Sequence, residues 1–314
     1  MLEPADDLLH GGPADDPSWT ETWWYPVYVP EERTAAYLYA VVRPVAGLAA
    51  GGIIVWDDRT DTLSDALYAD YRWADPFAHD GGNELRFRSG LSITISDPLD
   101  TSVITYRNAE EGVAIDVVFR ATAVAHNPSK EAKDKGIKGH FDQPGLIEGT
   151  IRVAGRDIAV RSYGVRDRSW GPRPDAGKRW WGDRIGYTTG ASAEFAFLAV
   201  SHPQSLERAV VFDGFIDEGG ARHAIASGSR ELHYGSDGRI ERVELQLVDD
   251  RGREHRLDGT VRSHCTFPSI PAMMTTVSMV TWTAADRDSL IGEDQDVWWQ
   301  HRWRAFARSR PPIG

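Results

Sequence analysis

Hydrophobic and polar residues alternate with a period of two along most of the chain, a pattern that predicts β-strands. Residues 91–105 alternate on both sides of a turn-rich Asp-Pro-Leu-Asp, and residues 146–163 do so around Gly-Arg-Asp, so each segment is predicted to form a hairpin. Six further strands are expected at residues 193–201, 207–216, 221–227, 239–248, 254–262 and 277–284. Many short strands separated by turns indicate an all-β barrel or sandwich.

Two further segments are expected to form a helix and a strand. Residues Thr62–Trp73 are expected to form one short helix, with Thr62 as its N-cap. Residues 297–304 are expected to form a strand. That strand would place Trp299, His301 and Trp303 on one face, where they would line a cavity or close a barrel against solvent.

The length of 314 residues favours two domains over one, although a single large β-barrel stays possible. Residues 127–139 are polar, basic and poor in β-forming residues, which is typical of a linker or a long loop. We therefore expect two β-rich domains, residues 1–139 and 140–314.

Charge and composition argue against several classes of partner. The formal net charge is −12, and binding to a phosphate backbone needs a basic surface, so neither nucleic acid nor an anionic membrane is expected. No apolar run approaches the ~18 residues of a membrane-spanning helix, and the acidic N-terminal segment does not resemble a signal peptide. A cytoplasmic location is predicted, while the oligomeric state stays open.

Sequence signals for cofactors and metals are missing. The chain has no glycine-rich nucleotide loop, no nucleophile elbow and no His-Glu-x-x-His, and its single cysteine excludes a site built on several thiolates. We predict that activity needs no nicotinamide, flavin or metal. A metal site assembled from distant residues is the open alternative.

Tryptophan is abundant, with twelve residues in the chain. Because each aromatic ring removes about 150 to 250 Å² from water, these rings are expected in a core or a pocket. Five residues are candidates to line a substrate cavity: Trp170, Trp181, Trp298, Trp299 and His301.

The densest stretch of chemistry-bearing residues runs from Tyr163 to Arg173. Gly149, the hairpin through Val160, Arg-Asp-Arg-Ser-Trp-Gly-Pro-Arg and a following Trp-Trp pair resemble the carotenoid 1,2-hydratase (hydroxyneurosporene synthase) and AttH-like family. The resemblance implies two tandem lipocalin-like β domains and apolar substrates that undergo water addition, elimination, isomerisation or cyclisation without redox cofactors. The family often has histidine where this chain has Arg168, and a guanidinium cannot shuttle protons.

Such reactions need a proton donor, and a carboxyl group kept neutral by an apolar pocket would supply it. Asp183 ranks first, because on a strand it would share a face with Trp181 and Tyr187 while Arg184 points away. Tyr187 would orient water or an enol, or else it is a core residue with a satisfied hydroxyl. Asp167 lies between two arginines and is either catalytic or, with more weight, a structural anchor.

Two functions from different classes stay open. The first is a cofactor-independent lyase or isomerase for a terpenoid-, steroid- or polyketide-like molecule, in a cavity where indole faces stabilise a developing carbocation. The second is a carrier that binds such a molecule unchanged, because a fold does not decide function. Glu293 and Asp294 are weaker candidates for the proton donor.

Overall fold

A computed structural model describes residues 2–127, 139–173, 183–270, 272–284 and 287–309. The chain forms two compact units: unit 1 comprises Met1–Trp56 and Ala66–Lys178, and unit 2 comprises Asp57–Asp65 and Arg179–Gly314. Most of the described residues lie in β-strands and few lie in helices, which confirms the predicted all-β class. Among these residues no helix is long and apolar enough to cross a membrane.

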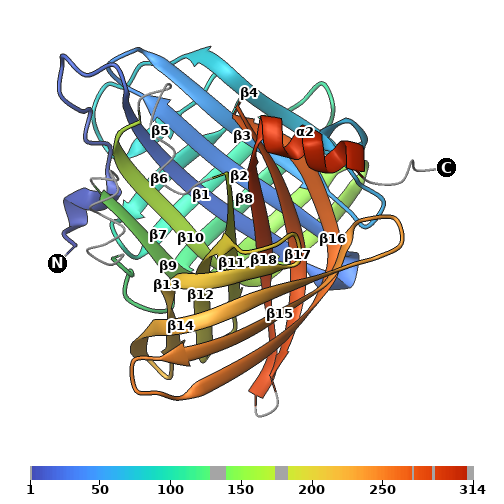
Figure 1. Cartoon of the computed structure of the whole chain (residues 1–314). Helices are drawn as coiled ribbons and strands as arrows, with labels where there is room; N and C mark the ends of the chain where they lie inside the picture. Colours follow the sequence, from blue (N-terminus) through green and yellow to red (C-terminus); the bar gives the residue numbers. More distant parts are fainter. Residues whose placement is uncertain (1, 128–138, 174–182, 271, 285–286, 310–314) are drawn as a thin grey trace. The chain divides into compact units, whose positions relative to one another are not determined.

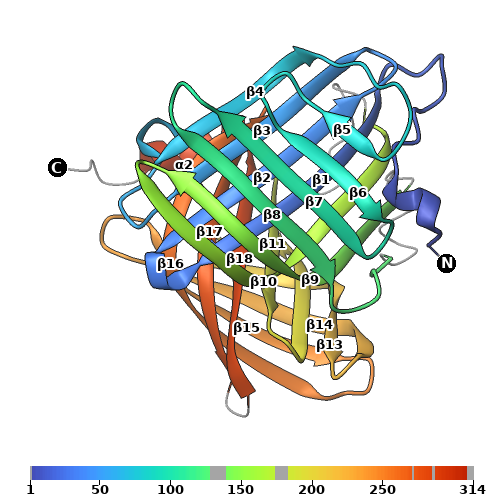
Figure 2. The same ribbon diagram turned by 180° about the vertical axis from the view of Figure 1, so that it is seen from behind.

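Unit 1 is built on one ten-stranded antiparallel sheet, drawn from blue to green in Figure 2. In spatial order its strands are β4 (Tyr68–Pro76), β3 (Leu48–Trp56), β2 (Thr34–Arg43), β1 (Trp19–Val29), β10 (Arg156–Pro172), β9 (Gly139–Val153), β8 (Val113–Ala121), β7 (Thr101–Asn108), β6 (Ser92–Asp97) and β5 (Glu84–Arg86). Two short 3-10 helices, η1 (Pro4–Asp7) and η2 (Pro30–Glu32), flank β1. Since β1 pairs with β10, the Trp-rich first strand lies beside the arginine-rich stretch singled out in the sequence.

Each strand of this sheet turns alternate side chains to opposite faces. One face carries the apolar core of unit 1, with Trp23, Ile53 and Phe119 among its buried members. The hydroxyl groups of Tyr68 in β4 and Tyr106 in β7 form a hydrogen bond, although six strands lie between them in the sheet. The sheet is therefore curled around its apolar face.

Unit 2 is a closed antiparallel barrel of eight strands, drawn from yellow-green to red in Figure 1. In order around the barrel they are β11 (Arg184–Ala191), β12 (Phe195–Pro203), β13 (Arg208–Glu218), β14 (Ala221–Tyr234), β15 (Ile240–Asp249), β16 (Glu254–Ile270), β17 (Met273–Ala284) and β18 (Arg287–Trp299). Helix α2 (Gln300–Ser309) follows β18, and η3 (Leu63–Asp65) lies next to β16, where Thr266 N donates to Asp61 O at 2.9 Å.

The barrel interior is apolar at one end and charged at the other. Phe197 and Trp282 belong to the buried apolar cluster. Arg184 and Arg230 are buried with aspartates of the second half of β18, nearer the end from which α2 continues. The barrel therefore combines an apolar cluster with buried ion pairs.

Most predicted strands are confirmed. β6 with β7 and β9 with β10 form the two predicted hairpins, and β12 to β17 coincide with the six strands predicted between residues 193 and 284. The unit division differs from the predicted boundary at residues 139/140, because β9 and β10 pair with β8 and β1 inside the first sheet. Most of the predicted linker, residues 128–138, lies outside the described residues.

The helix predicted over Thr62–Trp73 is wrong. η3 makes a single 3-10 turn, and β4 begins a few residues later. The N-terminal signal has a local basis, because the Asp65 carboxylate accepts a hydrogen bond from Thr62 N at 2.7 Å. Backbone pairing of β4 with β3 then outweighs the helical propensity of the remaining residues.

The strand predicted over residues 297–304 is also wrong beyond Trp299. There β18 ends and α2 begins, so Trp299, His301 and Trp303 do not share a strand face. In the helix, Trp303 and Phe306 lie one turn apart and both contact Trp298. Aromatic packing over one turn replaces the alternation that the sequence suggested.

Candidate functional site

A cross-strand row on the sheet face opposite the core of unit 1 combines acidic and aromatic residues. Residues in register on neighbouring strands place their side chains side by side on one face. From β9 to β4 the row consists of Asp142, Asp167, Trp24, Tyr39, Gly52 and Tyr71. The next row on this face lies two residues further along each strand. In it, Ser169 is in register with His140 on one side and with Thr22 on the other.

His140 lies between the two carboxylates. Its Nε2 is 2.9 Å from Asp142 Oδ2, and its Nδ1 is 3.1 Å from Asp167 Oδ2 without hydrogen-bond geometry. Asp167 also accepts a long hydrogen bond, 3.3 Å, from the Thr22 hydroxyl. The Asp142 side chain is 2% exposed, whereas that of Asp167 is 20% exposed. Asp167 is therefore the more accessible carboxylate of the two.

Burial and charge shift the pKa values in this cluster. Burial disfavours the charged imidazole, but the carboxylates of Asp142 and Asp167 outweigh it and raise the pKa of His140 to about 9. Burial also raises the pKa of Asp167, and His140 and Arg173 only partly oppose that shift. At neutral pH His140 is charged, and Asp167 binds a proton more tightly than an ordinary aspartate.

The same three residues offer a possible set of metal ligands. One ligand atom from each of His140, Asp142 and Asp167 lies within 4.8 Å of the others. A metal would need the imidazole deprotonated, whereas the two carboxylates hold the proton on His140. Metal binding at these residues would therefore compete with protonation of His140.

Beyond the two aspartates, the residues of the row that carry side chains are aromatic. The Trp24 ring is 5.9 Å from the Tyr37 ring, which in turn is 5.5 Å from that of Tyr39. Gly52 separates Tyr39 from Tyr71 in the row; its φ is +142°, and a Cβ there would lie 1.9 Å from a backbone carbonyl oxygen of β4. Glycine is required by this close approach, and it leaves no side chain between the two tyrosines.

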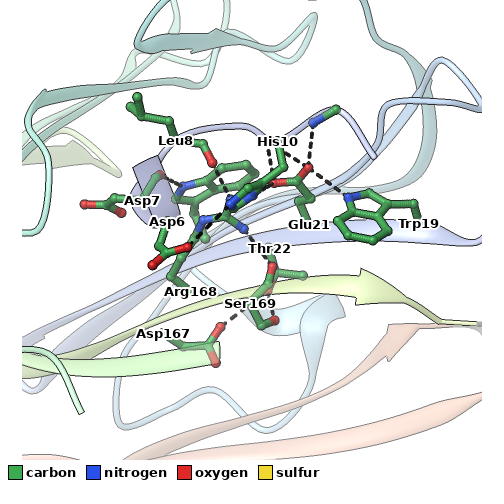
Figure 3. A network of polar contacts seen from close by, with 12 residues as sticks. Asp6, Asp7, Leu8, His10, Trp19, Glu21, Thr22, Asp167, Arg168 and Ser169 are labelled. Carbon is green, nitrogen blue, oxygen red and sulfur yellow. Dashed lines mark hydrogen bonds and ion pairs between the residues drawn. The ribbon is translucent and has the colours of Figure 1, made fainter. Parts of the chain in front are cut away.

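The other face of β10 holds a structural clamp (Figure 3). The fully buried Arg168 lies 3.9 Å from the centre of the Trp23 ring, and its Nη2 is 2.6 Å from Glu21 Oε2. Burial opposes ionisation of Glu21, but hydrogen bonding from His10 and the charge of Arg168 lower its pKa to about 2. Trp170, a predicted substrate-binding residue, instead stacks on His10 at 4.7 Å. Arg168 thus ties the N-terminal segment to the sheet.

The surroundings of Asp183, the proton donor ranked first from the sequence, differ from those expected. Asp183 directly precedes β11, is 35% exposed, and lies 2.8 Å from both Nε and Nη2 of Arg302. Tyr187 is half-buried and faces away from the barrel interior, because Arg184 and Thr188 alternate with it and turn inward. The expected apolar setting with no cation nearby is not present at Asp183.

The remaining candidates are spread over the charged end of the barrel. Trp298 is buried, and its Nε1 donates to Asp296 at 2.7 Å. Trp299 is half-buried at the end of β18, His301 is exposed on α2, and Trp181 lies outside the described residues. The two weaker acid candidates are both buried, Asp294 beside Arg230 and Glu293 beside Gln295.

Sequence reasoning missed the partners of Asp167: His140, Asp142, Trp24 and Tyr39. Three different strands supply them, and only sheet register brings them together. The one signal available was local, because His140 and Asp142 are two positions apart and would share a face of any strand.

The chain matches the profile of a protein family described as "Domain of unknown function (DUF7064)" over residues 3–291. It belongs to this family. Among curated proteins, no sequence matches that of this DUF7064 member.

Solved structures share the fold of this DUF7064 chain. CghA is 10% identical, with 94% of this chain and 96% of that chain covered and a TM-score of 0.54. A putative AttH (NE1406) from Nitrosomonas europaea is 9% identical, with 88% and 91% covered and a TM-score of 0.54. Kievitone hydratase from Nectria haematococca is 10% identical, with 94% of each chain covered and a TM-score of 0.53. These neighbours support the AttH-like fold implied by the resemblance, while its carotenoid hydratase part stays a prediction.

Proposed function

We propose that this protein is a cofactor-independent lyase, hydratase or isomerase that moves protons on a hydrophobic small molecule. The observation that carries the proposal is the position of Asp167: a carboxyl group with a raised pKa stands in one cross-strand row with Trp24 and Tyr39. The fold is also that of kievitone hydratase and of CghA, which has been crystallised with Sch210972.

In this mechanism protonated Asp167 is the general acid. It donates its proton to an alkene carbon or to a leaving hydroxyl group, and the positive charge that develops lies against the faces of the Trp24 and Tyr39 rings. Adding water to the cation and returning a proton to Asp167 completes hydration, and the reverse order gives dehydration. Loss of a proton from a neighbouring carbon instead gives isomerisation, again with Asp167 as the acceptor.

His140 and Asp142 act as positioning residues. The charged imidazole bonded to Asp142 offers its other nitrogen to Asp167, so it stabilises the aspartate formed after proton donation. This assignment reverses the ranking made from the sequence, because Asp183 is exposed and paired with Arg302. Asp167 takes the acid role and Arg168 the anchoring role.

The test is proton exchange in D2O. Purified protein is incubated with a panel of polyunsaturated and polycyclic hydrophobic compounds, and mass spectrometry detects deuterium incorporation or the gain or loss of water. With any compound that reacts, Asp167→Asn should lower kcat by about 10² to 10⁴, the usual contribution of a general acid. Asp183→Asn is the matched control and should keep wild-type turnover.

Three results would contradict the proposal. Full turnover by Asp167→Asn removes the assigned acid. A compound that binds but never exchanges deuterium supports the carrier function instead. Activity that is lost on exhaustive chelation and restored by one added metal would make the His140, Asp142 and Asp167 cluster a metal centre.

A further inference from the structure

The barrel of unit 2 contains a small cavity at the end covered by α2. Its volume is about 30 Å³, and its lining includes Tyr234, His264, Thr276, Ser278, Asp296 and Phe306. A water molecule needs about 10 to 15 Å³, whereas a benzene-sized ligand occupies about 150 Å³. A ring can enter this end of the barrel only if a side chain that now occupies it moves away.

Phe306 is the side chain that would have to move away. Its ring stacks on the Trp298 ring with centroids 5.0 Å apart and an interplanar angle of 9°, and it lies 6.2 Å from the Tyr234 ring. No residue of α2 is buried, and three are half-buried: Gln300 at its start, Trp303 and Phe306. Two rings therefore form the apolar contact of the helix with the barrel, and most of its other side chains are exposed.

The cavity also contains a buried polar group that is not satisfied. Ser278 is 1% exposed, and its Oγ has no hydrogen-bond partner within the described residues. A buried hydroxyl without a partner costs free energy, so a ligand hydroxyl at hydrogen-bond distance from it would be favoured.

The charges next to the cavity are already matched. Arg184 holds Asp296 through two hydrogen bonds of 2.8 and 2.9 Å, and Arg230 holds Asp294 through two of 2.7 and 2.5 Å. An added charge would be buried without a partner, which is costly, so the ligand is neutral.

We propose that this end of the barrel is a second binding site, for a neutral planar aromatic molecule that carries one hydroxyl group. The ligand ring takes the place of the Phe306 ring on Trp298 and beside Tyr234, and its hydroxyl bonds to Ser278. α2 is the lid whose phenylalanine occupies the site when the ligand is absent. The site belongs to unit 2 alone, so this proposal does not depend on the function proposed for Asp167.

The experiment titrates 2-naphthol into the full-length protein by isothermal titration calorimetry. Phe306→Ala removes the competing ring and should bind 2-naphthol about tenfold more tightly than wild type, which corresponds to one stacked ring pair. Adding Ser278→Ala in that background should weaken binding about fivefold, the usual effect of one hydrogen bond. Arg304→Ala, on the exposed side of the same helix, is the matched control and should bind like wild type.

Thermal melts check that each variant is folded, and Phe306→Leu replaces Phe306→Ala if the latter does not fold. Saturable binding that is equal in wild type, Phe306→Ala and the double variant would overturn the proposal, as would no binding in any of them. Binding that is lost in Asp167→Asn and insensitive to Ser278→Ala would assign 2-naphthol to unit 1, and would also overturn it.

Discussion

Two buried charge clusters, one in each unit, hold their carboxylates in different ways. At the charged end of the barrel, Asp294 and Asp296 are each held by a guanidinium through two hydrogen bonds, Asp294 by Arg230 at 2.7 and 2.5 Å and Asp296 by Arg184 at 2.8 and 2.9 Å. In the sheet, Asp167 has the Thr22 hydroxyl at 3.3 Å and His140 Nδ1 at 3.1 Å, the latter without hydrogen-bond geometry. The two carboxylates of the barrel are fixed by strong paired bonds, and that of Asp167 is not.

This difference suits the two clusters to different roles, one in stability and the other in proton donation. Burial would raise the pKa of Asp296, but the charges of Arg184 and Arg230 outweigh it and lower that pKa, so Asp296 has no proton to give. Asp167 is less fully compensated, and burial raises its pKa, which is the property that a general acid needs. The ion pairs of the barrel are therefore expected to respond to substitution through stability, and the acidic cluster of the sheet through activity and pH dependence.

The largest effect is expected from breaking a barrel pair. Arg230→Met leaves Asp294 buried without its partner, so the free energy of unfolding should fall by about 3 to 5 kcal/mol. Urea denaturation monitored by circular dichroism measures the loss. Arg256→Met, at an exposed position on β16, is the control and should stay within about 0.5 kcal/mol of wild type.

A double variant separates the charge of Arg230 from its packing. Arg230→Met combined with Asp294→Leu removes both charges, and because no charge is then left unpaired it should recover much of the lost stability. If the double variant is as unstable as Arg230→Met, the unpaired charge does not cause the loss of stability. The loss would then come from the packing around Arg230.

A smaller effect is expected from His140, and it depends on pH. Its pKa is about 9 in the folded protein and about 6.5 in the unfolded chain, so the folded state binds the proton more tightly. The resulting stabilisation, about 3 kcal/mol, is complete below pH 6.5 and is lost as the pH rises through 9. The difference in unfolding free energy between wild type and His140→Gln should shrink accordingly between pH 6 and 10. A difference that does not change with pH would mean that His140 is neutral in the folded protein.

The smallest effect is expected at Asp183. Its pair with Arg302 is exposed, so Asp183→Asn should cost at most about 1 kcal/mol, and added salt should reduce even that. Arg302→Gln should give a similar value, and a double-mutant cycle measures the coupling between them. A hundredfold loss of kcat in Asp183→Asn would restore Asp183 as the acid and remove the contrast between the two units.

The fold class could be predicted from the sequence alone. Alternation with a period of two is a property of each strand, so β6, β7, β9, β10 and β12 to β17 were predictable without knowledge of their partners. Where local signals competed with pairing, prediction failed. Thr62 N donates to the Asp65 carboxylate at the start of η3, but β4 follows after that single turn. The aromatic contact of Trp303 with Phe306 belongs to a helix, not to a strand.

Which residues act together depends on how the strands pair in the folded protein. The sequence marked Asp167 as a candidate, but the ranking of Asp183 above it assumed surroundings that depend on distant residues. Register across β9, β10, β1 and β2 places His140, Asp142, Trp24 and Tyr39 around Asp167, and β18 and α2 give Asp183 an exposed arginine partner. The pKa of a carboxyl group depends on burial and on charges within a few ångströms, and residues far apart in the sequence supply both.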